Sequence, residues 1–248
     1  TKTDYATLRE KRAMNEYEKE YVSLAEARDQ KYQLKEETYI PQKPNFLGVD
    51  VWENVDLSLL IPYIDWTPFF SSWQLKGKYP AIFNDPFVGE EAKTLYDQAN
   101  EMLAIIIAEK RLKAKAVFGI FKANSDGDDV ELYLHGDKND KVDLHFLRQQ
   151  RKKSDGLPYL CLSDFILPKS SNQDDYIGAF AVSAGFGIEP WVQEFQANHD
   201  DFNAIMMKSL ADRLAEALAE YLHYEVRKNI WGYSANENLD NEGLIAEK

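Results

Sequence analysis

The stretch KAVFGIFKANSDGDDVELYLHGDKNDKVDLHF, residues 115–146, contains three short apolar segments and two polar turns. The segments at 115–123, 130–135 and 142–146 are rich in β-branched and aromatic side chains, which favour strands. The turns between them, NSDGDD and GDKNDK, carry the Asp, Asn and Gly residues that are typical of hairpin connections. The pattern therefore predicts an antiparallel meander of three strands.

Two long helices and one further strand are predicted around this meander. Residues 89–113 have apolar side chains at intervals of three and four, which is typical of an amphipathic helix. These side chains are Ala92, Leu95, Ala99, Met102, Leu103 and Ile106. The same spacing predicts one helix from Pro190 to about Val226. Its apolar positions are Phe195, Phe202, Ile205, Met206, Leu210, Leu214, Leu218 and Leu222. The segment YIGAFAVSAG, residues 176–185, predicts a more buried strand.

Long helices packed with an antiparallel twisted sheet favour an α+β fold. The main domain is expected over residues 46–248. Residues 1–45 are expected to form a charged helical arm, with Tyr17, Tyr21 and Leu24 at helical spacing, followed by an extended linker that contains Pro41 and Pro44.

Composition excludes several classes of protein. The 248 residues carry a formal net charge of -13, and an acidic surface repels the phosphate backbone of nucleic acids. No apolar run reaches the roughly 18 residues that a membrane span needs. The single cysteine, Cys161, lies in the apolar segment LPYLCLSDF and is expected to be buried and inert. A reduced, cytosolic setting is therefore expected.

Conventional catalytic motifs are not found in the sequence. The histidines at 135, 145, 199 and 223 lack the spacing of a metal site, and NSDGDD lacks the glycine position of a calcium loop. GFG at 185–187 lacks the third glycine of a dinucleotide fingerprint. No G-x-S-x-G elbow occurs. No catalytic residue and no metal ligand is predicted.

Acidic residues near apolar groups are the remaining candidates. Asp65 lies within YIDWTPFFSSW, residues 63–73, where burial of a carboxylate is costly unless it has a partner. The simplest interpretation is that Asp65 caps a short helix or turn. Asp212 and Glu216 are four residues apart and share one helix face, and the simplest interpretation is that both are solvated.

Several stretches together resemble the C-terminal activation domain of cobalamin-dependent methionine synthase. The segment YIDWTPFFSSWQLKGKYP is similar to the signature of that family. LADRLAEALAEYLHYEVRKNIWGYSANENLDNEGLIAEK is similar to its long helix and the tail that follows. DYIGAFAVSAG and LRQQ fit as well, and the resemblance runs from about Leu24 to Lys248.

The resemblance implies a module that repairs a cofactor held by a neighbouring domain. Such a domain binds S-adenosylmethionine and presents its methyl group to oxidised cobalamin, while flavodoxin or a similar donor supplies an electron. Its partners are then the cobalamin-binding domain of the same enzyme and that electron donor. Cobalamin and zinc belong to other domains of the full enzyme.

The resemblance also assigns roles to single residues. Asp65 would contact the amino group of the ligand, and its aromatic neighbours would keep water away from the carboxylate. Glu216 would lie near the positively charged sulfonium, as would Glu247 in the tail. Asp212 would face the cobalamin domain. The expected cofactor-binding residues are therefore Asp65 and Glu216.

The family pattern continues beyond Lys248 with an arginine–proline and glycine–tyrosine segment whose arginine holds the ligand carboxylate. The domain is therefore expected to be incomplete at its C-terminus, with little ligand binding and no catalytic competence of its own. The alternative is a protein-docking domain without a small-molecule ligand. Dependence of binding on the charge of Asp65 distinguishes the two hypotheses.

Overall fold

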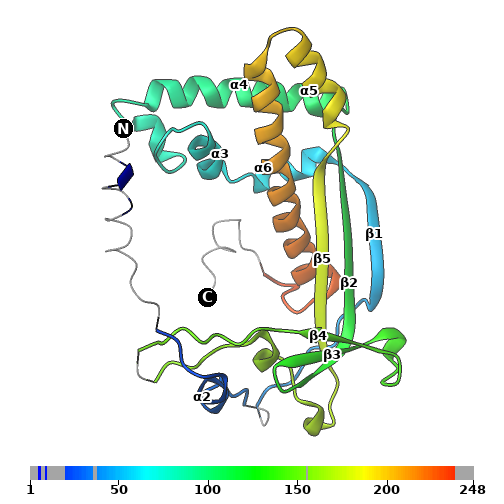
Figure 1. Cartoon of the computed structure of the whole chain (residues 1–248). Coiled ribbons are helices and arrows are strands. Elements are labelled where there is room, and N and C mark those ends of the chain that lie inside the picture. The colour runs from blue at the N-terminus through cyan, green and yellow to red at the C-terminus, as the bar shows by residue number, and fades with distance from the viewer. Residues whose placement is uncertain (1–4, 7–8, 10–19, 36–37, 155, 238–248) are drawn as a thin grey trace. The chain divides into compact units, whose positions relative to one another are not determined.

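The computed structural model describes residues 5–6, 9, 20–35, 38–154 and 156–237. The chain divides into two compact units (Figure 1). The first, here called the meander unit, contains residues 1–43 and 121–177. The second, called the helix unit, contains residues 44–120 and 178–248. Each unit is described by itself.

The meander unit contains the predicted antiparallel strands. The end of β2 (Lys113–Asp126) pairs with β3 (Asp129–Tyr133), and β3 pairs with β4 (Lys141–His145). The β2–β3 turn contains Gly127 at a φ of 67°, a conformation that glycine adopts without steric cost. The meander predicted from residues 115–146 is confirmed.

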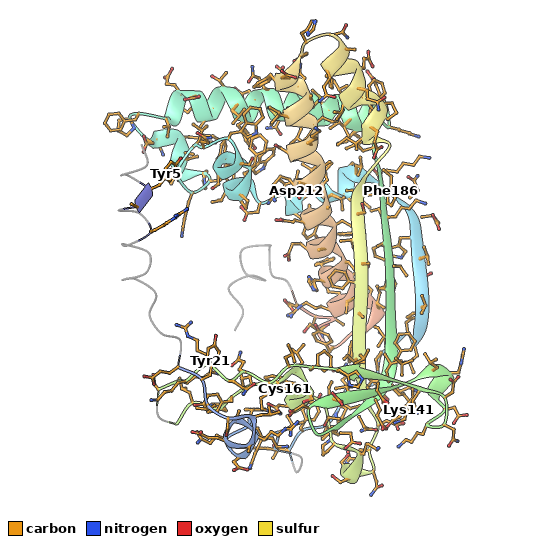
Figure 2. The ribbon with its side chains drawn as sticks, in the orientation of Figure 1. Tyr5, Tyr21, Lys141, Cys161, Phe186 and Asp212 are labelled. Atoms are coloured by element: carbon orange, nitrogen blue, oxygen red, sulfur yellow. The ribbon has the colours of Figure 1, made fainter. Side chains whose placement is uncertain are left out.

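The interior of the meander unit is partly polar. The side chain of Arg148 is fully buried, and its Nη1 and Nη2 atoms donate to the two carboxylate oxygens of Asp164 at 2.8 and 2.7 Å. Its Nε donates to Asp128 at 2.8 Å. A buried guanidinium is tolerated only when carboxylates and carbonyls satisfy it. Cys161 beside this network is 3% exposed, so its predicted burial is confirmed (Figure 2).

The predicted helical arm is only partly helical among its described residues, of which 5, 6 and 9 are helical. Of residues 20–35, only α2 (Leu24–Asp29) is helical, while Tyr21 forms an isolated bridge with Arg151. Ser23 caps α2 by accepting a hydrogen bond from Glu26 N, and the segment after Asp29 is irregular. Tyr17 lies outside the described residues.

The sheet of the helix unit is built on the first part of β2. Strand β1 (Gly48–Val55) pairs antiparallel with β2, from Gly48 opposite Ile120 to Val55 opposite Ala114, and β5 (Asp175–Phe186) pairs with β2 as well. Strand β1 was not predicted, because the sequence analysis placed no strand over residues 48–55. The predicted burial of β5 is also wrong, because residues 178–181 of this strand are exposed.

Helix α4 (Gly89–Ala108) confirms the first predicted helix, and all six residues of its apolar face are buried. The predicted helix 190–226 is instead two helices, α5 (Ile188–Ala197) and α6 (Asp201–Glu225) (Figure 1). His199 has a φ of 56°, which ends helical propagation. Asp200 then caps α6 by accepting from Asn203 N at 3.0 Å.

The core of the helix unit lies along α6. Its fully buried positions pack in one cluster with the short helix α3 (Trp66–Ser72) and the 3-10 helix Leu57–Tyr63. These positions are Met206, Met207, Leu210, Leu214, Leu218 and Leu222. The predicted α+β fold is thereby confirmed. Among the described helices, none has the length and apolarity needed to cross a lipid bilayer.

Candidate functional site

Asp65 is the N-cap of α3. Its carboxylate accepts a hydrogen bond from Thr67 N at 2.9 Å, and the residue is exposed. Its neighbours Ile64 and Trp66 are only 7% and 6% exposed. The expectation that aromatic side chains shield Asp65 is therefore wrong. The aromatic rings lie in the core, and the carboxylate faces solvent.

The aromatic residues after Asp65 hold α3 in place. The Trp66 ring lies 4.7 Å from the ring of Tyr96 on α4 and 5.3 Å from that of Phe69, with both pairs close to edge-to-face. Phe69 and Phe70 are fully buried. Such pairs add to the free energy of burial and have defined geometry. The packing of these rings therefore holds α3 in place, and with it the exposed carboxylate of Asp65.

The residues before Asp65 bring it beside the C-terminal half of α6. The Tyr63 ring lies 5.6 Å from the ring of Tyr221 and 6.1 Å from that of Tyr224. Burial raises the pKa of Tyr63 and of Tyr221, and the negative charge of Glu225 raises both further. The phenols of Tyr63 and Tyr221 therefore stay neutral at physiological pH.

Glu216 lies on α6 and is held by Arg213. Both oxygens of Glu216 accept from this guanidinium, at 2.7 and 2.8 Å, and Asp212 accepts from it at 2.6 Å. The carboxylates are 59% and 69% exposed, whereas the arginine side chain is 9% exposed. Burial lowers the pKa of Arg213, but the two ion pairs outweigh that effect and raise the pKa above its usual range.

Asp212, which Figure 2 labels, and Glu216 are therefore exposed, as predicted, but both are paired with Arg213. The sequence analysis overlooked Arg213, although its place next to one acid and three residues before another is a recognisable helix ion-pair pattern. No hydrogen bond joins Asp65 to Glu216 among the described residues. Glu247 lies outside the described part of the chain.

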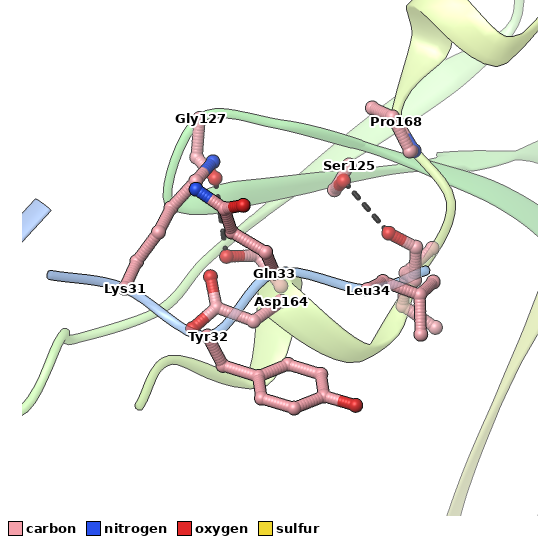
Figure 3. A pocket seen from close by; sticks show the side chains of 10 residues that line it. Lys31, Tyr32, Gln33, Leu34, Ser125, Gly127, Asp164 and Pro168 are labelled. Carbon is pink, nitrogen blue, oxygen red and sulfur yellow. Dashed lines mark hydrogen bonds between the residues drawn. The ribbon is translucent and has the colours of Figure 1, made fainter. Parts of the chain in front are cut away.

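A separate hollow of about 250 Å³ lies in the meander unit (Figure 3). Three of its polar side chains have partners within the fold: Ser125 donates to Ile166 O at 2.9 Å, Ser163 donates to Gly127 O at 3.1 Å, and Asp164 is neutralised by Arg148. Polar groups that are already satisfied offer little to a ligand. The surface around Asp65 is therefore the stronger candidate.

Comparison with known proteins shows what this chain is similar to. Residues 56–248 match the family model for the activation domain of vitamin B12 dependent methionine synthase. A solved structure of the MetH reactivation domain bound to AdoHcy is 49% identical to this chain, with a TM-score of 0.85. The match covers 91% of this chain and 69% of that one. The resemblance found in the sequence and the predicted fold are both confirmed.

Proposed function

Because this chain belongs to the activation-domain family of vitamin B12-dependent methionine synthase, a methyltransferase, we propose that it binds S-adenosylmethionine for the reductive remethylation of oxidised cobalamin. The observation that carries the proposal is the solved structure that is 49% identical and contains AdoHcy. AdoHcy is S-adenosylhomocysteine, the molecule that remains when S-adenosylmethionine has given up its methyl group.

The exposed carboxylate of Asp65 fits the ligand's ammonium group. Within the described part of the chain, one hydrogen bond reaches this carboxylate, from Thr67 N to Oδ1, and Oδ2 can accept from an ammonium. Charges 4 Å apart attract by about 1 kcal/mol in water and about 4 kcal/mol at a protein surface, before desolvation. The exposure of Asp65 favours the lower part of that range.

The ligand would supply an electrophilic methyl group, and the residues of this chain would orient it. Asp65 would fix the amino-acid end, while the carboxylates of Glu216 and Asp212 would keep the surface of α6 negative for a cationic ligand. Asp212, exposed on α6, would contact the cobalamin-binding domain, and flavodoxin or a similar donor would supply the electron. We expect the chain by itself to lack methionine synthase activity.

The test is a calorimetric titration of S-adenosylmethionine into the protein expressed to the gene's own stop codon. Asp65→Asn removes the charge but keeps an oxygen that accepts from Thr67 N, so α3 stays capped. We expect this variant to bind at least tenfold more weakly, equivalent to about 1.4 kcal/mol.

Asp56→Asn is the matched control. Asp56 is also an exposed N-cap in the helix unit, and it accepts from Ser58 N at 2.9 Å. We expect its replacement to leave the affinity unchanged. If the unmutated protein does not bind, the ligand proposal fails and a protein-docking domain takes its place. Equal losses in both variants would exclude a specific role of Asp65.

A further inference from the structure

A second hollow of the meander unit, of about 530 Å³, is lined by Tyr21 and residues 149–153 and is called the Arg151 hollow here. Three of these lining residues are cations, Arg151, Lys152 and Lys153, and none is acidic. The chain as a whole carries a net charge of -13. Salt at physiological concentration screens exposed charges that are more than about 8 Å apart. The cations at the hollow, rather than the net charge, therefore decide which ligand it attracts.

The backbone holds Tyr21 and Arg151 next to each other. The two residues form an antiparallel bridge. Val22 N donates to Gln150 O at 2.9 Å on one side of the bridge, and a second backbone bond of 2.9 Å flanks it on the other side. Tyr21 and Arg151 are thus a non-hydrogen-bonded pair, in which the Cβ atoms lie about 4.5–5.5 Å apart. Both residues are exposed, so the phenol and the guanidinium reach solvent side by side.

Side chains of the extended segment at this bridge alternate between two sides. On one side they have partners: Gln150 Nε2 donates to a backbone carbonyl at 3.0 Å, and Lys152 pairs with Glu20 at 2.6 Å. On the other side lie Gln149 and Arg151, whose side chains have no partner in the described part of the chain. The donors of these two side chains are available to a ligand.

Arg151 differs in this respect from the other arginines between residues 20 and 237. Each of the others pairs with a carboxylate in the described part of the chain. They are Arg28, Arg111, Arg148, Arg213 and Arg227. Acidic residues outnumber basic ones by 42 to 29, so carboxylates are plentiful in this chain, yet none occupies Arg151. Its planar fork of N–H donors fits the oxygens of a phosphate.

The remaining groups of the hollow are donors as well. Nζ of Lys153 donates to Pro158 O at 2.7 Å, which leaves two of its three N–H groups. The Gln149 amide adds two N–H donors, and Tyr21 adds a hydroxyl and a ring that is part of a 65% exposed residue. A volume of about 530 Å³ lies within the usual range of ligand pockets and exceeds the needs of one phosphate.

We propose that the Arg151 hollow binds a polyphosphate anion, either a free polyphosphate or the triphosphate of a nucleotide. Arg151 binds phosphate oxygens through two parallel hydrogen bonds, and Lys153 and Gln149 donate to neighbouring oxygens. In the nucleotide, the base would stack on the exposed ring of Tyr21.

The test is a calorimetric titration of sodium tripolyphosphate, without added Mg²⁺, into the protein expressed to the gene's own stop codon. Arg151→Gln removes the charge, and Arg151→Lys keeps the charge but loses the fork. We expect Arg151→Gln to weaken tripolyphosphate binding by about tenfold or more, because charge-assisted hydrogen bonds are lost. Arg151→Lys should weaken binding by about threefold, because a point charge remains.

Uridine triphosphate distinguishes the two sources of the anion. It carries a triphosphate but lacks the adenine of S-adenosylmethionine, so it does not imitate that ligand. Binding that is tighter than that of tripolyphosphate, with the difference lost in Tyr21→Leu, assigns a nucleotide. Equal binding of the two compounds assigns a free polyphosphate. Either result supports the phosphate site.

Lys138→Gln is the matched control. Lys138 is also an exposed cation of the meander unit beside a tyrosine, with its Nζ 5.5 Å from the centroid of the Tyr133 ring, but it does not line the hollow. Its replacement removes the same charge as Arg151→Gln and should change the affinity by less than about twofold. Circular dichroism reports whether each variant is folded.

Two results overturn this inference. One is equal weakening by Arg151→Gln and Lys138→Gln, which would show attraction by overall charge alone. The other is a dissociation constant above about 1 mM for tripolyphosphate and the unmutated protein. The proposed function can fail separately, since Asp65 belongs to the helix unit. A protein that binds tripolyphosphate but not S-adenosylmethionine would keep the Arg151 hollow and lose the proposed function.

Discussion

Replacement of Asp164 by Asn should destabilise the meander unit strongly. The carboxylate of Asp164 is 1% exposed and faces Arg148, whose side chain is fully buried. Both of its oxygens accept from this guanidinium, and one also accepts from Cys161 N at 2.9 Å. An asparagine keeps the shape but removes the charge and turns an amide N–H₂ toward the arginine.

The size of the effect follows from the burial. Removal of one partner of a buried ion pair costs about 3–5 kcal/mol, because the other charge is left without compensation. Arg148 keeps a second carboxylate, that of Asp128, on its Nε at 2.8 Å. Partial compensation places the expected loss near the lower limit, about 3 kcal/mol.

The assay must report the meander unit alone. All five tryptophans, at positions 52, 66, 73, 191 and 231, belong to the helix unit, so their fluorescence does not report β3 or β4. Hydrogen exchange of the amides of β3 does. A loss of about 3 kcal/mol should raise their exchange rates by 100-fold or more, since each 1.4 kcal/mol is about tenfold.

Asp143→Asn is the control, because Asp143 lies on β4, pairs with Lys141 at 3.2 Å and is 46% exposed. Loss of this exposed ion pair should lower the free energy of unfolding by less than about 1 kcal/mol. Arg148→Met combined with Asp164→Leu should recover stability relative to Asp164→Asn, since the apolar pair removes both fully buried charges and Asp128 keeps its ion pair with Arg28 at 2.8 Å. The reasoning is refuted if Asp164→Asn raises β3 exchange by less than tenfold.

Two further predictions concern packing and pH. Gly89→Ala should lower the free energy of unfolding by about 1–3 kcal/mol in urea denaturation followed by tryptophan fluorescence, because the new Cβ would lie 2.7 Å from Phe83 O. Gly185→Ala, whose Cβ would meet only Ala211 Cβ at 4.0 Å, should be close to neutral, and a larger loss there would contradict the argument. The ammonium groups of Lys141 and Lys169 lower the pKa of Glu131. The free energy of folding that these ion pairs contribute is therefore complete above the usual pKa of a glutamate, about 4.3, and is lost as the pH falls through the lower pKa of the folded state. Hydrogen exchange of β3, after correction for intrinsic rates, should show this loss between pH 5 and about pH 2, and a Glu131→Gln variant that keeps the full pH slope would exclude it.

Elements with regular local patterns could be predicted from the sequence. The meander was predicted because turn residues separate its strands, and α4 because its apolar side chains recur every three or four residues. The same rule failed at residues 198–200. Apolar spacing continues across them, but His199 takes a left-handed conformation and Asp200 starts a new helix. Strand β1 was missed because it is a half-exposed edge strand that includes Asp50 and Glu53.

The cap at Asp65 is local, and the sequence alone favoured it, since an aspartate before a short helix accepts from the backbone two residues on. Its exposure was not evident, because the directions of the neighbouring aromatic side chains depend on the core they enter. The packing of Tyr63 against two tyrosines of α6 and the Arg148 network required the tertiary structure. Tyr63 meets Tyr221 and Tyr224 only after the chain has returned along α6. Sequence periodicity records which face of an element is buried, whereas the partners on that face are set by packing between segments that are far apart in the chain.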